Sequence, residues 1–374
     1  MAKKLLNNES MTPSQEEETS QLPISSYFDE ALYEAELEQL FVKGPRYLGH
    51  ELMVPNLNDY HVLEPKLGGD YLKCTEDGVQ MFSNVCRHRQ AIMLKGRGNA
   101  RSTLCPLHHW AFDAQGKLKG APHFTEKPCL HLPETTLVNW QGLLFEDNGR
   151  DIANDLRPLE VESHIDFSGY RYHSTHIDEY EGNWKTFIEV YLEDYHVRPF
   201  HPGLSHFVDC DALEWRFGEW CSAQLIGVFR ELGKHGSPAY EEYANALKIH
   251  YQEGLPRYGA VWFTYFPNIM IECYPEMLVV STVWPTGVRR YRNIVEFYHS
   301  QAAVEAVPDF IEISQRSYLE TAYEDQEIIE RMELGREALR RAGRNEVGPY
   351  QHPTETGMAH FHRFLRTMLP EHIA

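Results

Sequence analysis

Two short motifs combine cysteine and histidine at spacings that suit metal binding. The first is Cys-x-His, formed by Cys86 and His88, and the second is Cys-x-x-His, formed by Cys105 and His108. Sixteen residues separate the two motifs, which is enough to place them on two neighbouring loops. Each motif offers one thiolate and one imidazole, and both groups are good ligands for transition metals. The pattern predicts one metal centre built from two loops.

The mixed order of the ligands favours an iron–sulfur cluster over zinc. Two thiolates and two imidazoles are the ligand set of a Rieske [2Fe–2S] centre, in which the thiolates hold one iron and the imidazoles hold the other. Zinc sites more often pair cysteine with cysteine and histidine with histidine. His109 is an alternative ligand, but the Cys-x-x-His spacing favours His108. A centre of this type passes single electrons to another group.

A second set of candidate ligands follows in the segment YHVRPFHPG, where His196 and His201 stand five residues apart. On an ideal helix this spacing would point the two side chains in different directions. Pro199 is expected to end the helix after His196, so that His201 returns from the loop beyond it. Two imidazoles at such a corner suit a mononuclear non-haem Fe(II), which needs one carboxylate ligand and keeps positions open for dioxygen.

Asp325 is the predicted carboxylate ligand. Residues 318–334, YLETAYEDQEIIERMEL, have a helical pattern, and the apolar Ala322, Ile328 and Ile329 stand three or four residues from Asp325. Asp325 therefore lies on the inward face, where a carboxylate is costly unless it is paired or bound to a metal. Glu324, one residue away, is the competing candidate.

Glu193 precedes His196 by three residues, which would place both on one face of a helix. It could accept a hydrogen bond from His196 and fix the orientation of that imidazole, or bridge to a histidine of another Rieske domain. Asp194 lies one residue off that face and is expected to be solvated. We therefore interpret Glu193, and not Asp194, as part of the site.

The composition excludes several classes of protein. The 374 residues contain 35 Lys and Arg against 55 Asp and Glu, which gives a net charge of −20. This charge argues against binding to nucleic acid or to an anionic membrane surface. The sequence has no apolar run long enough to span a membrane, no apolar signal core and no glycine-rich nucleotide motif. We expect a cytoplasmic protein that does not itself bind NAD or flavin.

Changes in sequence pattern divide the chain. Residues 1–26 are polar and are expected to form a disordered tail, and residues 27–44 to form an amphipathic helix. Residues 45–160 contain short apolar runs between Gly, Pro and Asp, which predicts an antiparallel β domain that carries both cluster motifs. Residues 161–374 mix helical and strand-like segments. The predicted fold class is α+β.

The two metal patterns, their order and their separation resemble those of the catalytic (α) subunits of Rieske non-haem iron oxygenases, the ring-hydroxylating oxygenase family. The resemblance rests on the cluster motifs and on the segments NWKTFIEVYLEDYHVRPFHPG, FPNIMI and YEDQEII, and it covers the chain from about residue 27 to its end. It implies an N-terminal antiparallel β Rieske domain and a C-terminal helix-grip catalytic domain. It also implies a [2Fe–2S] cluster, a mononuclear Fe(II) and O2 as co-substrate.

The resemblance also assigns roles to residues. It implies the cluster ligands Cys86, His88, Cys105 and His108 and the iron ligands His196, His201 and Asp325. Asn183 matches a family position near the iron, and Glu193 would lie where the cluster of one subunit meets the iron of the next. The family implies a homotrimer and a separate NAD(P)H-dependent reductase of the flavin or ferredoxin type.

An oxygenase component that hydroxylates, demethylates or cleaves a small organic substrate is the implied activity. Glu193 replaces the usual Asp, and this residue and the ending ETGMAHFHRFL are similar to the carnitine monooxygenase branch, which indicates a quaternary amine. Aromatic residues of the predicted sheet, such as Trp262 and Tyr274, could surround such a cation or simply form the core. The alternative enzyme is an aromatic-ring hydroxylating dioxygenase α subunit. The alternative of another class is a Rieske electron-transfer or sensor protein.

Overall fold

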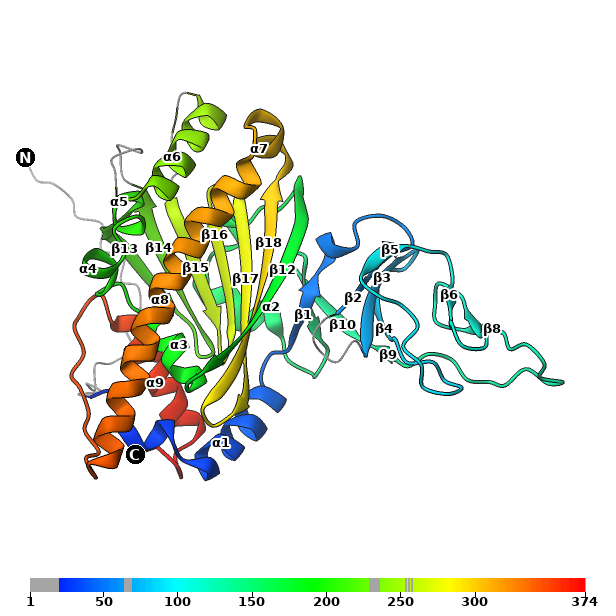
Figure 1. Cartoon of the computed structure of the whole chain (residues 1–374), viewed down its shortest axis with the longest axis horizontal. Coiled ribbons are helices and arrows are strands. Elements are labelled where there is room, and N and C mark those ends of the chain that lie inside the picture. Colours follow the sequence, from blue (N-terminus) through cyan, green and yellow to red (C-terminus); the bar gives the residue numbers. More distant parts are fainter. Residues whose placement is uncertain are drawn as a thin grey trace, which may run out of the picture.

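The structure of the protein, a computed structural model, describes residues 20–63, 69–228, 236–252, 254, 256 and 258–373. A β-rich part near the N-terminus projects from one side of a larger part, in which helices cover an antiparallel sheet (Figure 1). The predicted α+β class, with an N-terminal antiparallel β part and a C-terminal helix-grip part, is confirmed.

Short antiparallel strands make up the N-terminal part. Among the described residues they form three small sheets, with the orders β1-β11-β10, β5-β2-β3-β4-β9 and β6-β7-β8. The β3–β4 hairpin turns at Gly78, whose φ of +100° is a conformation that glycine adopts readily. The strands are β1 (Tyr47–His50), β2 (Asp59–Val62), β3 (Asp70–Thr75), β4 (Gly78–Ser83), β5 (Arg97–Asn99), β6 (Thr103–Leu104), β7 (Ala111–Phe112), β8 (Leu118–Gly120), β9 (Glu134–Thr135), β10 (Leu137–Trp140) and β11 (Leu143–Glu146).

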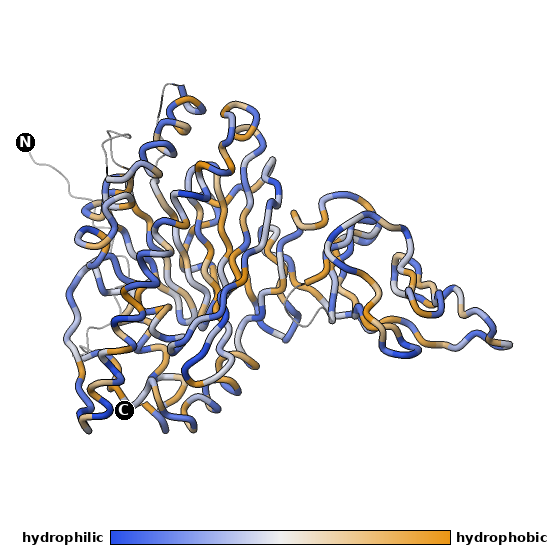
Figure 2. The backbone as a smooth tube through the Cα atoms, in the orientation of Figure 1, coloured by the Kyte–Doolittle hydropathy of each residue, from blue (hydrophilic) through white to orange (hydrophobic). Residues whose placement is uncertain are grey.

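The C-terminal part is built on a seven-stranded antiparallel sheet with the order β12-β18-β17-β16-β15-β14-β13. Its central strands are long apolar runs, visible as hydrophobic segments in Figure 2. Such runs suit a sheet that is covered on both faces. The strands are β12 (Tyr170–Glu181), β13 (Val208–Phe217), β14 (Cys221–Val228), β15 (Tyr258–Tyr265), β16 (Ile269–Tyr274), β17 (Met277–Gly287) and β18 (Arg290–Ser300).

Helix α8 is the longest described helix and crosses one face of the large sheet; α3 packs against its C-terminal half, and α9 packs against α3 (Figure 1). None of the described helices is both long and apolar enough to cross a membrane. The helices are α1 (Glu30–Glu36), α2 (Ile152–Leu156), α3 (Trp184–Tyr191), α4 (Val197–Phe200), α5 (Leu204–Phe207), α6 (Pro238–Tyr251), α7 (Gln301–Ala306), α8 (Phe310–Arg341) and α9 (Thr356–Met368). Shorter helical segments are η1 (Ile24–Tyr27), η2 (Leu37–Val42), η3 (Glu51–Met53), η4 (Arg157–Leu159) and η5 (Glu162–His164).

The N-terminal segment differs from the sequence prediction. Residues 1–19 of the expected tail lie outside the described residues, but residues 20–26 are packed and not disordered. Leu22 and Tyr27 are 2% and 1% exposed, because these apolar side chains join the main core. The predicted helix begins at Glu30, after its Asp29 cap, and continues as a π-helix from Leu37.

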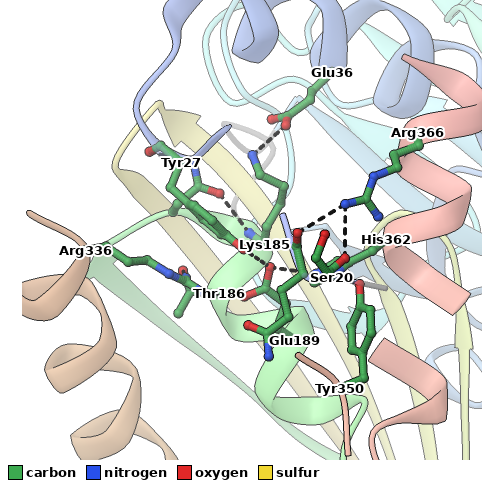
Figure 3. A network of polar contacts seen from close by, with 12 residues as sticks. Ser20, Tyr27, Glu36, Lys185, Thr186, Glu189, Arg336, Tyr350, His362 and Arg366 are labelled. Carbon is green, nitrogen blue, oxygen red and sulfur yellow. Dashed lines mark hydrogen bonds and ion pairs between the residues drawn. The ribbon is translucent and has the colours of Figure 1, made fainter. Parts of the chain in front are cut away.

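A buried polar network connects this N-terminal segment to α3, α8 and α9 (Figure 3). Glu189 on α3 accepts hydrogen bonds from the hydroxyl of Tyr27 at 2.5 Å and from the guanidinium of Arg336 at 2.7 Å. The imidazole of His362 lies 3.0 Å from the same carboxylate. The network fixes α3 against α8, and these two helices lead to the residues of the candidate site.

Candidate metal centres and active-site cavity

The two cysteine–histidine motifs come together at the tips of two similar loops. The backbone N–H of Cys86 donates to Ala91, and that of Cys105 donates to Trp110, so each loop closes on itself after its cysteine. Cys86 and Cys105 are each 1% exposed. Burial raises the pKa of the Cys86 thiol, and the adjacent Cys105 thiol raises it further. The two sulfur atoms are therefore neighbours in a protected position.

The two predicted histidines form a matching pair. The rings of His88 and His108 lie 4.7 Å apart, and the indole of Trp110 stacks on His88 at 5.0 Å. His109 is exposed and has a φ of +58°, and it is His108 whose ring approaches His88. A pair of thiols beside a pair of imidazoles is the donor set that a Rieske cluster requires, so these residues fit the group.

His196, His201 and Asp325 converge in the C-terminal part. The Nε2 atoms of the two histidines lie 2.9 Å apart, and Oδ1 of Asp325 lies 2.9 Å from His201 Nε2 and 3.3 Å from His196 Nε2. One donor atom from each residue thus faces a common point, as expected of ligands around one metal ion.

The outer nitrogens of the same histidines are held by carboxylates. Nδ1 of His196 lies 2.5 Å from Glu193, and Nδ1 of His201 lies 2.7 Å from Glu324. A carboxylate can only accept, so Nδ1 carries the proton and the Nε2 lone pair remains for a metal. Burial alone would lower the pKa of His196, but Asp325 and Glu193 raise it to about 10; the carboxylates thus favour a cationic ring, and a bound metal ion would take the place of the proton on Nε2. The site therefore favours positive charge at its centre, and its residues fit a mononuclear iron.

The backbone around these histidines differs from the prediction. Helix α3 ends at Tyr191, and His196 and His201 flank the short helix α4 instead of following a long one. Pro199 lies inside the first turn of α4, where a missing N–H is tolerated, so it does not end a helix. Asp194, which was expected in solvent, is 3% exposed. Glu193 nevertheless contacts His196, through a loop geometry and not a helix face.

Asn183 does not take the position that the resemblance implied. Its side chain caps α3 by accepting from the N–H of Lys185 at 3.0 Å, and it donates to the carbonyls of Tyr27 and Val288. It is not among the residues that line the cavity described below. Because all of these bonds are local to the start of α3, the assignment of Asn183 beside the iron is corrected to a capping residue.

A cavity of 440 Å³ opens beside the three convergent ligands. It lies between α8, the segment from α3 to α4 and one face of the large sheet. Six acidic residues line the cavity. Among the described residues, no lysine or arginine lines it. The acidic residues are Asp178, Glu179, Glu193, Asp194, Glu272 and Asp325. Such a lining suits a positively charged small molecule.

Glu272, on β16, is the acidic residue that the sequence interpretation missed. It is 4% exposed and accepts hydrogen bonds from the hydroxyls of Tyr274 at 3.0 Å and Tyr318 at 3.2 Å. Burial raises its pKa to about 8. A signal was present in the sequence, because a glutamate inside the apolar run IMIECY is costly unless it has a partner.

Aromatic rings surround Glu272. Trp262 stands directly opposite it in the sheet, and the rings of Trp262 and Tyr274 lie 5.8 Å apart. The sequence interpretation left two roles open for the aromatic residues of this sheet, a cage or the core. Trp262 and Tyr274 line the cavity, whereas Phe263 and Tyr265 belong to the main hydrophobic core, and the cage stays a prediction.

The fold and these two sites define a Rieske oxygenase. Residues 31–135 match the profile of the Rieske [2Fe–2S] domain, and residues 167–371 match that of the ring hydroxylating alpha subunit (catalytic domain). The chain belongs to the family of ring-hydroxylating oxygenase alpha subunits. As a member it uses a [2Fe–2S] cluster, a mononuclear iron and O2, and it takes electrons from a separate partner to hydroxylate a small organic substrate.

The chain is also similar to individual proteins of this family. It is 53% identical over 350 residues to putrescine 2-hydroxylase of Ralstonia nicotianae, and this alignment covers 94% of this chain and 96% of that protein. It is 45% identical over 367 residues to putrescine 2-hydroxylase of Bordetella bronchiseptica, and this alignment covers 94% of this chain and 85% of that protein. A solved quaternary ammonium Rieske monooxygenase has the same fold, with a TM-score of 0.75 at 19% identity over 94% of this chain and 95% of the other.

Proposed function

We propose that the chain hydroxylates a C–H bond of a short aliphatic diamine, and that putrescine is the substrate to test first. The observation that carries this proposal is the cavity beside His196, His201 and Asp325, with its six carboxylates and, among the described residues, no lysine or arginine. Protonated amines are the small organic molecules that such a lining attracts. The 53% identity to a putrescine 2-hydroxylase supports the choice of a diamine.

Seven residues would hold the two metal groups. In this proposal they are Cys86, His88, Cys105 and His108 for the cluster and His196, His201 and Asp325 for the iron. When bound, the cluster supplies electrons and the iron supplies the chemistry that activates O2. Each turnover would replace one C–H bond by C–OH, consume one O2, two electrons and two protons, and release one water.

The protein residues orient the ligands and shape the cavity. Glu193 and Glu324 keep the Nδ1 protons of His196 and His201 in place, so that both Nε2 atoms stay aimed at the metal position. The sheet side of the cavity includes buried side chains, such as Trp262 at 6% exposure, which would limit the access of bulk water to the reacting carbon.

A quaternary ammonium substrate is the second candidate. The aromatic wall formed by Trp262 and Tyr274 favours it, because aromatic rings bind methylated ammonium groups. Carnitine itself carries a carboxylate, and the described lining offers no lysine or arginine to bind that group. Aromatic hydrocarbons would offer no cation to Asp194 and Glu272, the buried carboxylates of the lining that form no ion pair among the described residues, so the ring-hydroxylating alternative is not favoured.

We also propose a homotrimer in which the cluster of one copy serves the iron of the next. The hairpins that carry the cluster motifs lie at the end of the molecule opposite α8 (Figure 1), which supports transfer between copies. A separate NAD(P)H-dependent reductase and a cytoplasmic location complete the proposal. The two domains would meet near residue 160, after the last strand of the N-terminal part.

Oxygen uptake by the purified protein with a suitable reductase tests the proposal. We expect uptake that depends on putrescine, matched by a hydroxylated product in mass spectrometry, and three irons and two acid-labile sulfides per chain. Uptake with choline but not with putrescine would instead establish the second candidate. A reducible cluster without oxygen uptake on any amine or aromatic substrate would favour the electron-transfer or sensor alternative.

A further inference from the structure

We propose that Glu272 binds an ammonium group of the substrate and thereby decides which carbon lies beside the metal ligands. This inference rests on the proposed function, because it assumes a substrate with a protonated amine. It adds to that function a specificity-determining residue, which neither the metal pattern nor the motifs of the family identify in this chain.

Glu272 lies in the wall of the cavity that also contains the metal ligands. It lies in the middle of the large sheet on β16, paired with Trp262 on one neighbouring strand and with Val279 on the other. Side chains alternate between the faces of a strand, so Glu272 and Tyr274 lie on the same face and line the same cavity. The metal ligands line the same cavity, with His196 and His201 at the two ends of α4 and Asp325 on α8.

The contacts of Glu272 leave part of its carboxylate available to a ligand. Its two oxygens each accept one phenolic hydroxyl, from Tyr318 and from Tyr274. Within the described part of the chain it forms no ion pair. Each carboxylate oxygen has two lone pairs, so one on each oxygen remains for a further donor. A buried carboxylate without a cation is costly, and a ligand cation would remove that cost.

The surrounding rings define the chemistry of that cation. Trp262, Tyr274 and Tyr318 place aromatic surface beside the carboxylate, with ring separations of 5.8 Å and 6.1 Å around Tyr274. Aromatic surface attracts any ammonium group, but only an amine with N–H bonds can also donate to Glu272. The pocket therefore selects a primary ammonium group over a quaternary one.

The decisive variant is Glu272→Gln, which keeps the size and most hydrogen bonds of the side chain but removes its charge. We expect the KM for putrescine to rise about 10- to 100-fold, the range of a hydrogen bond to a charged group, with a smaller change in kcat. The preference in kcat/KM for putrescine over neutral 1,4-butanediol should fall by a similar factor. Iron and sulfide contents should match those of the parent enzyme.

Glu296→Gln is the matched control. Glu296 is also a buried glutamate of the large sheet and also accepts from two tyrosine hydroxyls, those of Tyr47 and Tyr298, but it does not line this cavity. Its replacement tests whether loss of any buried carboxylate disturbs the enzyme. We expect the folded control protein to keep the KM of the parent for putrescine.

The two proposals fail in different ways. If the parent enzyme uses no amine, the proposed function is wrong before Glu272 is tested. If it uses putrescine but Glu272→Gln keeps a KM within about threefold, the ammonium site is overturned and the function stands. Should Glu272→Gln not fold, Tyr318→Phe provides the test, because it removes one of the two hydroxyls that hold Glu272. We expect a several-fold rise in KM, and an unchanged KM and preference would overturn the inference.

Discussion

Buried carboxylates occur in this protein in two contrasting regions. In the network of Figure 3, Glu189 faces the guanidinium of Arg336 and the imidazole of His362. In the cavity, the partners of Glu272 among the described residues are the hydroxyls of two tyrosines. Removing a carboxylate from water requires compensation by a cation or by several hydrogen bonds. The network supplies its cation from within the chain, whereas the cavity has space for a cation from outside.

The pKa values of the two glutamates express the same contrast. Burial alone would raise the pKa of Glu189, but Arg336, His362 and Tyr27 lower it to about 2. Burial raises the pKa of Glu272 to about 8, since its tyrosine hydrogen bonds only partly oppose the effect. Glu189 is therefore charged without any ligand, whereas Glu272 needs a neighbouring cation to be fully ionised at neutral pH.

Removal of a metal ligand should have the largest effect on the cavity side. We expect Asp325→Ala to lose one iron per chain, to keep the cluster signal, and to lose turnover by at least about 1000-fold, or about 4 kcal/mol in activation free energy. Glu327→Ala is the control, because Glu327 lies on the same helix and pairs with Arg331 in solvent. Metal analysis and oxygen uptake measure both, and iron retained at the parent level in Asp325→Ala would exclude it as a ligand.

Removal of the internal cation should damage the network side most. Arg336→Met leaves Glu189 buried beside an apolar side chain, so the free energy of unfolding should fall by about 3–5 kcal/mol in chemical denaturation. The control Arg331→Met breaks an exposed pair on the same helix and should cost at most about 1 kcal/mol. Equal effects of the two variants would contradict a structural role for the network.

Acid titration should give the smallest of these effects. The folded-state pKa of Glu189 is about 2, below the usual value of about 4.3, so its contribution to stability is complete above about pH 4.5 and is lost as the pH falls toward 2. We expect Glu189→Gln to reduce the slope of the free energy of unfolding against pH in this range. The reduction is up to about 1.4 kcal/mol per pH unit, which corresponds to one proton bound on unfolding. Urea denaturation at several pH values measures the slope, and an unchanged slope would show that folding does not lower the pKa of Glu189.

Local sequence patterns were sufficient to find the residues that converge at both metal centres. The cysteine and histidine of each cluster motif lie within one short loop, and His196 and His201 lie at the two ends of one short helix, so short spacings in the sequence mark them. Asp325 was also predictable, because a carboxylate on the apolar side of a helical pattern indicates a buried partner. The structure brings Asp325 against both Nε2 atoms and Glu324 against the outer nitrogen of His201, which gives the two acidic neighbours different contacts.

Features that depend on tertiary packing were not predictable from those patterns. The end of α3 at Tyr191 and the burial of Asp194 are set by contacts with distant segments, such as the hydrogen bond from the N–H of Asp194 to the carbonyl of Thr354. Glu272 was missed because its partners Tyr318 and Trp262 come from a helix and another strand. Residues that are far apart in the sequence cannot be recognised as one cluster from local patterns. The charge of Glu272 inside the apolar strand was nevertheless a signal that it has a partner.

The two walls of the cavity have consequences for how this enzyme could diversify. The metal ligands come from the two ends of α4 and from α8, whereas strands β12, β15, β16 and β18 supply the side chains of the sheet wall. Every second position of a strand faces that wall, so a few exchanges there can alter the accepted compound without touching the oxygen chemistry. Descendants of a duplicated gene would thus be expected to diverge first at inward strand positions, and laboratory evolution toward new amines can begin with the same small library.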